Sequence, residues 1–195
     1  MWKFVKSVLD KSQWLDVKSH MQICFWGRSN VGKSSLLNAL IGQNISYVSK
    51  RPGRTQLINY FNEDDNYIID FPGYGYAKMS KEKIEHMNKC VRDYLAHEPN
   101  EKVLFLLIDA RTGITKNDFE TIEFVKKIKW PYHIIYTKID KLNQKEKSQL
   151  IKKHNEYVAN NLFKDNSRAF LVSSEKRINL DELIEFIQEL FYAVL

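Results

Sequence analysis

Cysteine is scarce in this chain of 195 residues, which contains only Cys24 and Cys90. Two such cysteines match neither a disulfide framework nor the spacing of a metal site. Both lie in apolar-patterned segments, so we expect buried, reduced thiols. This fits a protein of a reducing compartment.

Long apolar runs are also missing. The longest clear run, residues 103–108, is far too short to span a bilayer. The N-terminus lacks the apolar segment followed by small residues that marks a signal peptide. There is no internal repeat, low-complexity segment or long linker. We therefore expect a cytoplasmic protein without a membrane partner. We also expect a monomer.

Positive charge is in excess: the net charge is +6 and the isoelectric point is about 9.1. This balance is compatible with a polyanionic partner such as nucleic acid, although solvated lysine-rich faces are common. The length fits one domain and leaves little room for a separate RNA-binding module.

Apolar runs alternate with helical patterns, which predicts an α/β domain. We expect residues 21–195 to form a mixed, mostly parallel six-stranded sheet with helices on both faces. Residues 1–20 would be an N-terminal extension of unsettled structure. The predicted strands are 21–26, 56–61, 67–70, 103–109, 133–137 and 169–173, and the predicted helices are 33–41, 80–97, 118–129, 144–160 and 180–191.

The segment GRSNVGKS, residues 27–34, matches the P-loop pattern between a predicted strand and a predicted helix. Its glycines let backbone N–H groups converge on phosphate oxygens, and the helix N-terminus adds its positive dipole end. Lys33 would reach the β- and γ-phosphates, and the Ser34 hydroxyl would bind Mg²⁺. The predicted phosphate-binding residues are Gly27, Arg28, Ser29, Asn30, Val31, Gly32, Lys33, Ser34 and Ser35.

Two further motifs follow strands. In DFPG, residues 70–73, Asp70 can hold Mg²⁺ through water, and Gly73 can offer its N–H to the γ-phosphate. In TKID, residues 137–140, Asp140 can accept two hydrogen bonds from guanine that adenine cannot donate. The stem of Lys138 can lie along the base, and Thr137 stands where many guanine sites have asparagine. Each short motif alone could be an ordinary turn after a strand.

In this order the motifs resemble the translation-factor class of P-loop GTPases and, more narrowly, the EngB (YihA/YsxC) family of ribosome-assembly GTPases. The residues that carry the resemblance are GRSNVGKSSLLNAL (27–40), RPGRTQLINYF (51–61), DFPGYGYAK (70–78), TKIDKL (137–142) and SSEKRINLDEL (173–183).

The resemblance implies a single Ras-like P-loop GTPase domain that binds GTP or GDP with Mg²⁺. It implies that Thr55 is the switch threonine, so that Ser34, Thr55 and Asp70 form the metal site. It also implies that Ser173 and Ser174 bring backbone groups to guanine O6. The family often has glycine at Asn179 and His-Pro at residues 112–113, so these two positions depart from its pattern.

Hydrolysis should be slow, because Tyr74 occupies the position where Ras-like enzymes have a water-orienting glutamine. Arg51 and Arg54 lie in the switch loop, but phosphate contact, RNA contact and plain solvation all remain open for them. Asn30 resembles the P-loop asparagine of GTPases that bind K⁺, whose charge would stabilise the transition state. The expected catalytic residues are Lys33, Thr55, Gly73 and Asn30.

The resemblance points to the large ribosomal subunit precursor and its rRNA as partners, with GTP ordering the switch loops. Two alternatives are a small-molecule phosphotransferase of the P-loop kinase type and a non-catalytic GTP-dependent module linked to cell division. The basic residues that could meet rRNA phosphates are Lys141, Lys145, Lys147, Lys152, Lys153, Lys176 and Arg177.

Overall fold

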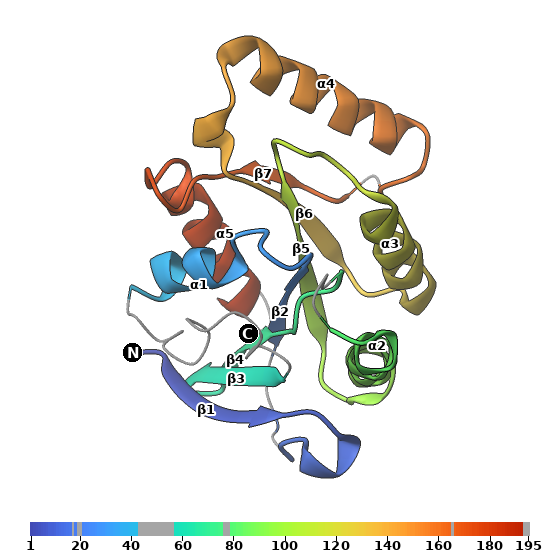
Figure 1. Cartoon of the computed structure of the whole chain (residues 1–195). Coiled ribbons are helices and arrows are strands. Elements are labelled where there is room, and N and C mark those ends of the chain that lie inside the picture. Colours follow the sequence, from blue (N-terminus) through green and yellow to red (C-terminus); the bar gives the residue numbers. More distant parts are fainter. Residues whose placement is uncertain (17, 19–20, 43–56, 76–78, 165, 193–195) are drawn as a thin grey trace.

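The computed structural model describes residues 1–16, 18, 21–42, 57–75, 79–164 and 166–192, which form one sheet flanked by helices (Figure 1). The strands are β1 (Lys3–Val8), β2 (Gln22–Gly27), β3 (Ile58–Glu63), β4 (Asn66–Asp70), β5 (Lys102–Asp109), β6 (Tyr132–Thr137) and β7 (Ala169–Leu171). The helices are η1 (Lys11–Gln13), α1 (Lys33–Ile41), α2 (Lys81–His97), α3 (Lys116–Ile128), η3 (Ile139–Lys141), α4 (Gln144–Ala159) and α5 (Leu180–Tyr192). Within these residues, no helix combines the length and apolar content needed to cross a membrane.

The predicted α/β class is confirmed, but the predicted count of six strands is wrong. Among the described residues, the sheet has seven strands in the order β1-β3-β4-β2-β5-β6-β7. The additional strand, β1, pairs antiparallel with β3 at the edge of the sheet. Only its last residue, Val8, is buried, so its sequence lacks the apolar alternation of a half-buried strand. Residues 1–20, expected to be an extension, thus supply an edge strand to the same sheet.

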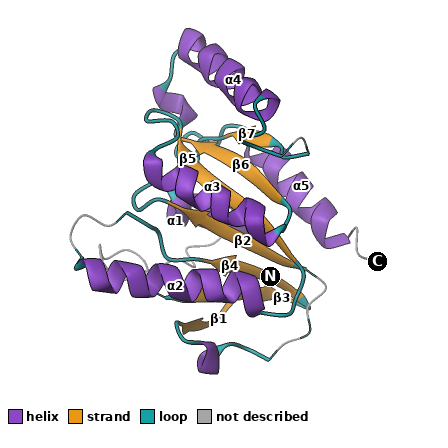
Figure 2. Ribbon diagram, turned by 90° about the vertical axis from the view of Figure 1, so that its right-hand side faces the viewer, coloured by secondary structure: helices purple, strands orange, loops and turns teal. Residues whose placement is uncertain are grey.

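The helices form a layer on each face of the sheet. Figure 2 shows α2 and α3 lying along one face, where their apolar residues pack on one core. Helices α1 and α5 pack on the other face in a second core. Helix α4 lies at one end, beyond β7 (Figure 1).

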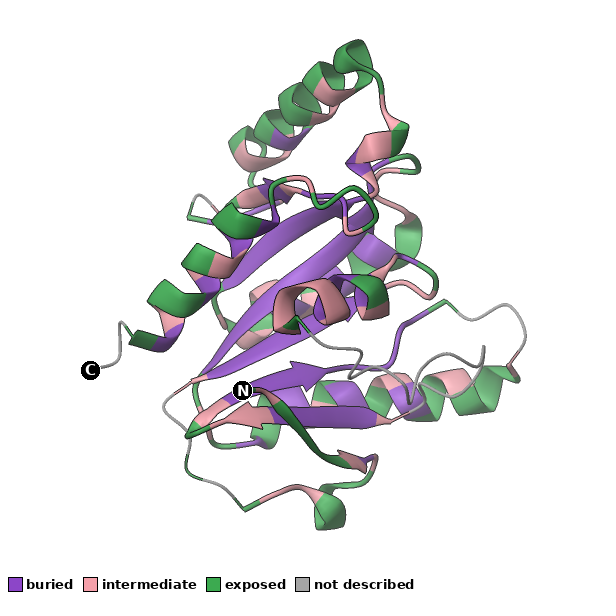
Figure 3. Ribbon diagram, turned by 90° about the vertical axis from the view of Figure 1, so that its left-hand side faces the viewer, coloured by how far each residue is buried: buried purple, intermediate pink, exposed green. Residues whose placement is uncertain are grey.

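The central parallel strands are buried throughout, as Figure 3 shows for the ribbon between the helices. Every residue of β2, β5 and β6 is buried. Strands covered on both faces leave their carboxyl ends as the accessible edge, where α/β sheets bind ligands. The three predicted motifs all follow strands at this edge.

The imidazole of His133 on β6 is buried among Phe105, Phe170 and Phe186. Its Nδ1 accepts a hydrogen bond of 3.0 Å from the backbone N–H of Arg168. Burial, and then the nearby charge of Arg168, lower the pKa of His133 from 6.5 to about 4. The folded protein therefore holds this imidazole neutral.

Because the folded pKa is depressed, the unfolded chain binds this proton more readily. The stability that neutral His133 contributes is complete above pH 6.5 and is lost as the pH falls from 6.5 towards 4. We expect His133 to account for at most about 3 kcal/mol of this loss. Urea unfolding between pH 7.5 and 4.5 measures this loss of stability. His133→Asn should flatten the dependence of the free energy of unfolding on pH, whereas His97→Asn, at an exposed residue of α2, should not. Parallel profiles for wild type and His133→Asn would contradict the assignment.

Candidate nucleotide-binding site

The loop between β2 and α1 has the backbone curvature that a phosphate cradle requires. Asn30 and Gly32 have positive φ angles of 65° and 99°, which turn successive N–H groups towards one point. At the start of the loop, a Cβ on Gly27 would lie 2.9 Å from the Cβ of Leu107, so a side chain does not fit there. The first turn of α1 begins at Lys33, directly after this curve.

The P-loop is bonded to the DFPG loop through the backbone. The N–H of Ser29 donates to the carbonyl of Tyr74 at 2.8 Å, and the N–H of Tyr74 donates to the carbonyl of Gly27 at 3.2 Å. Gly73 packs so closely that a Cβ there would lie 3.0 Å from the nitrogen of Ser29. A shift of the DFPG loop must therefore displace the P-loop or break these contacts.

A buried ion pair joins Lys33 Nζ to Asp70 Oδ1. Their side chains are 7% and 5% exposed, so each charge has lost most of its hydration. The opposite charge and local hydrogen bonds must compensate for that loss. The second carboxylate oxygen accepts a hydrogen bond of 3.2 Å from Asn59 Nδ2 on β3. Asn59 Oδ1 in turn accepts one of 2.6 Å from the Ser7 hydroxyl on β1. The edge strand β1 is thus linked to Asp70.

Thr137 and Lys138 attach the end of β6 to the P-loop. The Thr137 hydroxyl donates to the carbonyl of Val31 at 2.6 Å. Lys138 Nζ donates to the carbonyl of Asn30 at 2.7 Å and to Asp109 Oδ2 at 2.9 Å. Lys138 therefore lies across the mouth of the phosphate loop, held at its far end by a carboxylate.

That carboxylate, Asp109 at the end of β5, is itself held in place. It accepts hydrogen bonds from Arg111 Nε and Nη2 at 3.0 and 2.8 Å. Burial raises the pKa of Asp109, but the bonds from Arg111 and Lys138 outweigh it and hold the pKa well below its usual value. Thr112 and Gly113 close a turn by donating their N–H groups to the Asp109 carbonyl.

Asp140 has a carboxylate oxygen suited to a ligand. A hydrogen bond from the Ser173 side chain, together with Lys141, holds the pKa of Asp140 below its usual value. Its Oδ2 is buried and pairs with Lys141 Nζ at 3.0 Å. Lys141 also pairs with Glu175 at 2.9 Å. Lys141, predicted as an RNA contact, is thus engaged beside Asp140.

The segment after β7 forms a tight turn next to Asp140. Ser173 and Ile178 exchange backbone hydrogen bonds of 3.2 and 3.0 Å, and Ser173 is fully buried. Asn179 has a φ of 54°, the left-handed conformation that asparagine tolerates, and its Nδ2 donates to the Leu171 carbonyl at 2.8 Å. Asparagine therefore supports the left-handed turn at this position. Ser174 follows Ser173 in this turn.

Tyr74 points away from the phosphate loop. Its hydroxyl donates a hydrogen bond of 2.7 Å to Asp118 on α3, and its ring packs edge-on against Trp26 at 5.6 Å. Burial, and then the Asp118 carboxylate, raise the pKa of Tyr74 well above its usual value. The phenol is therefore protonated and bonded to α3 in this structure.

The structure brings together most of the predicted site residues at the carboxyl ends of β2, β4 and β6. Ser34 and Ser35 lie in the first turn of α1, with Ser35 exposed. Sequence reasoning missed Asn59, Asp109 and Asp118, of which only Asp109 carries a signal, its place at a strand end. Thr55, Arg51 and Arg54 lie outside the described residues.

Residues 22–138 match the model of the 50S ribosome-binding GTPase family. A probable GTP-binding protein EngB of Mycoplasmopsis agalactiae is 62% identical over 97% of both chains, and that of Mycoplasmopsis synoviae is 49% identical over 98% of this chain and 100% of its own. A crystal structure of a probable GTP-binding protein EngB matches with a TM-score of 0.67 and 26% identity, covering 87% of this chain and 98% of that one. The structure of Era with MgGDPNP and a 16S rRNA fragment matches with a TM-score of 0.66 and 27% identity, covering 88% and 57%. The chain therefore belongs to the EngB family and is a GTP-binding P-loop GTPase.

Proposed function

We propose that this GTPase acts as a slow, Mg²⁺-dependent switch in assembly of the large ribosomal subunit. The observation that carries the switch is the direct backbone bonding between the P-loop and the DFPG loop at Ser29, Tyr74 and Gly27. The ribosomal partner rests on the description of the matching family as 50S ribosome-binding. Membership of a GTPase family argues against the small-molecule phosphotransferase alternative.

The residues at the phosphate end fit a nucleotide bound with a hard divalent cation. Hydroxyl and carboxylate oxygens are the ligands that Mg²⁺ prefers, and Ser34 and Asp70 supply them at neighbouring strand and helix ends. Mg²⁺ would neutralise charge on the β- and γ-phosphates. Thr55 is proposed as the third protein group of this site.

Lys33 would exchange partners when the nucleotide binds. Its ammonium pairs with Asp70 in the described structure, whereas the P-loop role requires it to face the β- and γ-phosphates. Asp70 would then turn to the cation, with Asn59 holding its other oxygen. Gly73 would donate its N–H to the γ-phosphate.

Removing the Asn59 amide should weaken Mg²⁺ binding through Asp70. Groups that orient a ligating carboxylate typically contribute about 10–100-fold in metal affinity. We expect Asn59→Ala to raise the Mg²⁺ concentration for half-maximal GTP hydrolysis by roughly 10-fold or more. Ser7→Ala, one hydrogen bond further away, is the matched control and should shift it less. An unchanged Mg²⁺ dependence in a less stable Asn59→Ala protein would reduce Asn59 to a packing role.

The Tyr74 hydroxyl should matter for folding and not for turnover. Because this hydroxyl bonds to buried Asp118, Tyr74→Phe should lower the free energy of unfolding by about 1–3 kcal/mol. Single-turnover GTP hydrolysis should stay within about twofold of wild type, whose rate we expect well below the roughly 1–100 s⁻¹ of kinases. Tyr192→Phe, at an exposed tyrosine of α5, should change neither quantity. A tenfold fall in the hydrolysis rate of Tyr74→Phe would show that the phenol contributes to catalysis.

We also propose that Asn30 supplies an oxygen to a K⁺ ion beside the phosphates. Asn30 is exposed, and its backbone carbonyl accepts the bond from Lys138, so the side-chain amide is the group that can face a cation. Replacing Na⁺ by K⁺ at equal ionic strength should raise turnover, and Asn30→Ala should remove the difference. Equal rates in the two salts would refute the K⁺ proposal and would not affect the proposal of a slow GTPase switch.

The ribosomal contact should combine a nucleotide-dependent surface with a basic one. Lys145, Lys152 and Lys153 are exposed on α4 and suit RNA phosphates better than Lys141, which is paired. Reversing these three charges should weaken binding in both nucleotide states and flatten its salt dependence. Thr55→Ala should instead abolish only the preference for the GTP state.

Co-sedimentation with immature and mature large subunits across a salt series tests this assignment. We expect more pelleting with a GTP analogue than with GDP. Equal pelleting in the two states would refute the switch. No pelleting in either state would refute the ribosomal partner and favour the module linked to cell division.

A further inference from the structure

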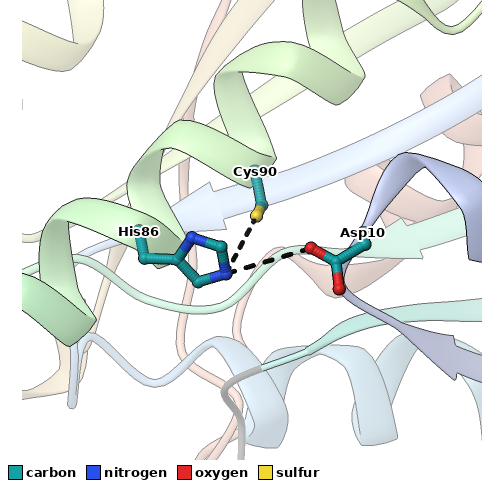
Figure 4. Close-up of side chains that lie close together, drawn as sticks. All are labelled: Asp10, His86 and Cys90. Atoms are coloured by element: carbon teal, nitrogen blue, oxygen red, sulfur yellow. Dashed lines mark hydrogen bonds and ion pairs between the residues drawn. The ribbon is translucent and has the colours of Figure 1, made fainter.

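Three potential metal ligands meet between the N-terminal segment and α2, remote from the P-loop in the sequence. They are Asp10, directly before η1, and His86 and Cys90, one helical turn apart on α2. Figure 4 shows dashed contacts that run from the His86 ring to the Asp10 carboxylate and to the Cys90 thiol. We propose that Asp10, His86 and Cys90 form a Zn²⁺ site that fastens the N-terminal segment to α2.

The distances are close to those of a tetrahedral zinc site. His86 Nε2 lies 3.9 Å from Asp10 Oδ1 and 3.8 Å from Cys90 Sγ, and all three ligand atoms lie within 4.8 Å of one another. Zinc bond lengths of about 2.0–2.3 Å imply ligand separations of roughly 3.4–3.6 Å. The two His86 separations must shorten by roughly 0.2–0.5 Å, and the Asp10–Cys90 separation by at most about 1.4 Å, which rotation of the exposed Asp10 side chain can supply.

The supporting structure holds the ligands in place. Residues 86, 90 and 94 recur every four positions, so they form one stripe of α2 facing η1. At the end of this stripe Trp14 packs edge-on against Tyr94, with ring centroids 5.2 Å apart. The chain around Asp10 is fixed by hydrogen bonds of 3.1 and 3.3 Å from the N–H groups of Leu9 and Asp10 to Gln13 Oε1.

The ligand chemistry selects the class of metal. A thiolate and an imidazole with one carboxylate suit Zn²⁺, whereas Mg²⁺ and Ca²⁺ take oxygen ligands. Asp10 and His86 side chains are 59% and 58% exposed, which provides an entry path and room for a water as fourth ligand. Cys90 is buried at the base of the site. The site is therefore distinct from the Mg²⁺ position proposed at Asp70.

Cobalt spectroscopy on the full, chelator-stripped chain tests the proposal, with a phosphine reductant and with GDP and millimolar Mg²⁺ present. We expect one Co²⁺ per chain, a thiolate charge-transfer band, tetrahedral d–d bands, and displacement by Zn²⁺. Excess Zn²⁺ should raise the Tm by roughly 5 °C. Cys90→Ser should lose the charge-transfer band, and His86→Gln and Asp10→Asn should each weaken binding at least tenfold.

His97→Gln is the matched control, because His97 is an exposed histidine of the same helix bonded to the Asp93 carbonyl. It should bind as wild type does. Absence of the band at micromolar protein and metal, or its persistence in Cys90→Ser, would overturn the site. Exposed His86 and Asp10 make their two variants informative even if Cys90→Ser does not fold.

Discussion

Replacing Asp140 by asparagine should lower GTP affinity by about 10²–10³-fold and move the base preference to xanthine. The reason lies in the carboxylate of Asp140, which η3 places just beyond the end of β6 and whose Oδ2 lies 3.0 Å from Lys141 Nζ. In the proposed complex the carboxylate accepts from the guanine ring N–H and its amino group. Asparagine presents a donor in place of one acceptor, which opposes the guanine amino group and suits the carbonyl of xanthine.

Competition of GTP, XTP and ATP against a fluorescent guanine nucleotide measures this change in base preference. Lys141→Ala is the matched control: it removes the cation next to Asp140 and leaves both carboxylate oxygens, so GTP affinity should fall far less. In wild type, ATP should compete only weakly. Equal affinity of the wild-type protein for ATP and GTP would show that Asp140 does not read the base.

The helices and central strands could be predicted because their patterns are strong. Strands buried on both faces, such as β5, read as continuous apolar runs, and helices such as α5 repeat apolar residues at helical spacing. Strand β1 could not be predicted in this way. Its pairing with β3 depends on backbone hydrogen bonds at the sheet edge, which place few demands on its side chains.

Some residues of the site could likewise be predicted from the sequence and others could not. Lys33, Asp70 and Asp140 belong to contiguous motifs whose spacing encodes their chemistry. Asn59 lies opposite Asp70 across the β3–β4 hairpin, and Asp118 lies 44 positions from Tyr74. The motif spacings encode neither contact.

The cluster of Asp10, His86 and Cys90 could not be predicted from the sequence. The cysteines fit no metal-site spacing in the sequence, since the two other ligands are a histidine one turn away and an aspartate in another segment. Only the fold, which places η1 against α2, brings the three together. A scan for cysteine spacing alone cannot find such a site.

Removing Lys33 should produce the largest loss at the phosphate end, and it should act on stability as well as on binding. Two charge-assisted contacts to phosphates correspond to about 3–6 kcal/mol, so Lys33→Ala should weaken GTP binding by roughly 10²–10⁴-fold. It also leaves Asp70 as a buried carboxylate without its cation. Breaking a buried pair from one side costs about 3–5 kcal/mol, which urea unfolding without nucleotide should reveal.

The double variant Lys33→Ala/Asp70→Asn separates the two effects. Neutralising Asp70 removes the unpaired charge while the amide can still accept from Asn59 Nδ2, so most of the lost stability should return. GTP binding should not return, because the phosphates still lack the ammonium and the cation site now lacks its carboxylate. If GTP affinity recovered along with stability, Lys33 would act only by supporting the fold. If neither recovered, the pair would be only one part of a larger buried network, which extends through Asn59 to Ser7 and β1.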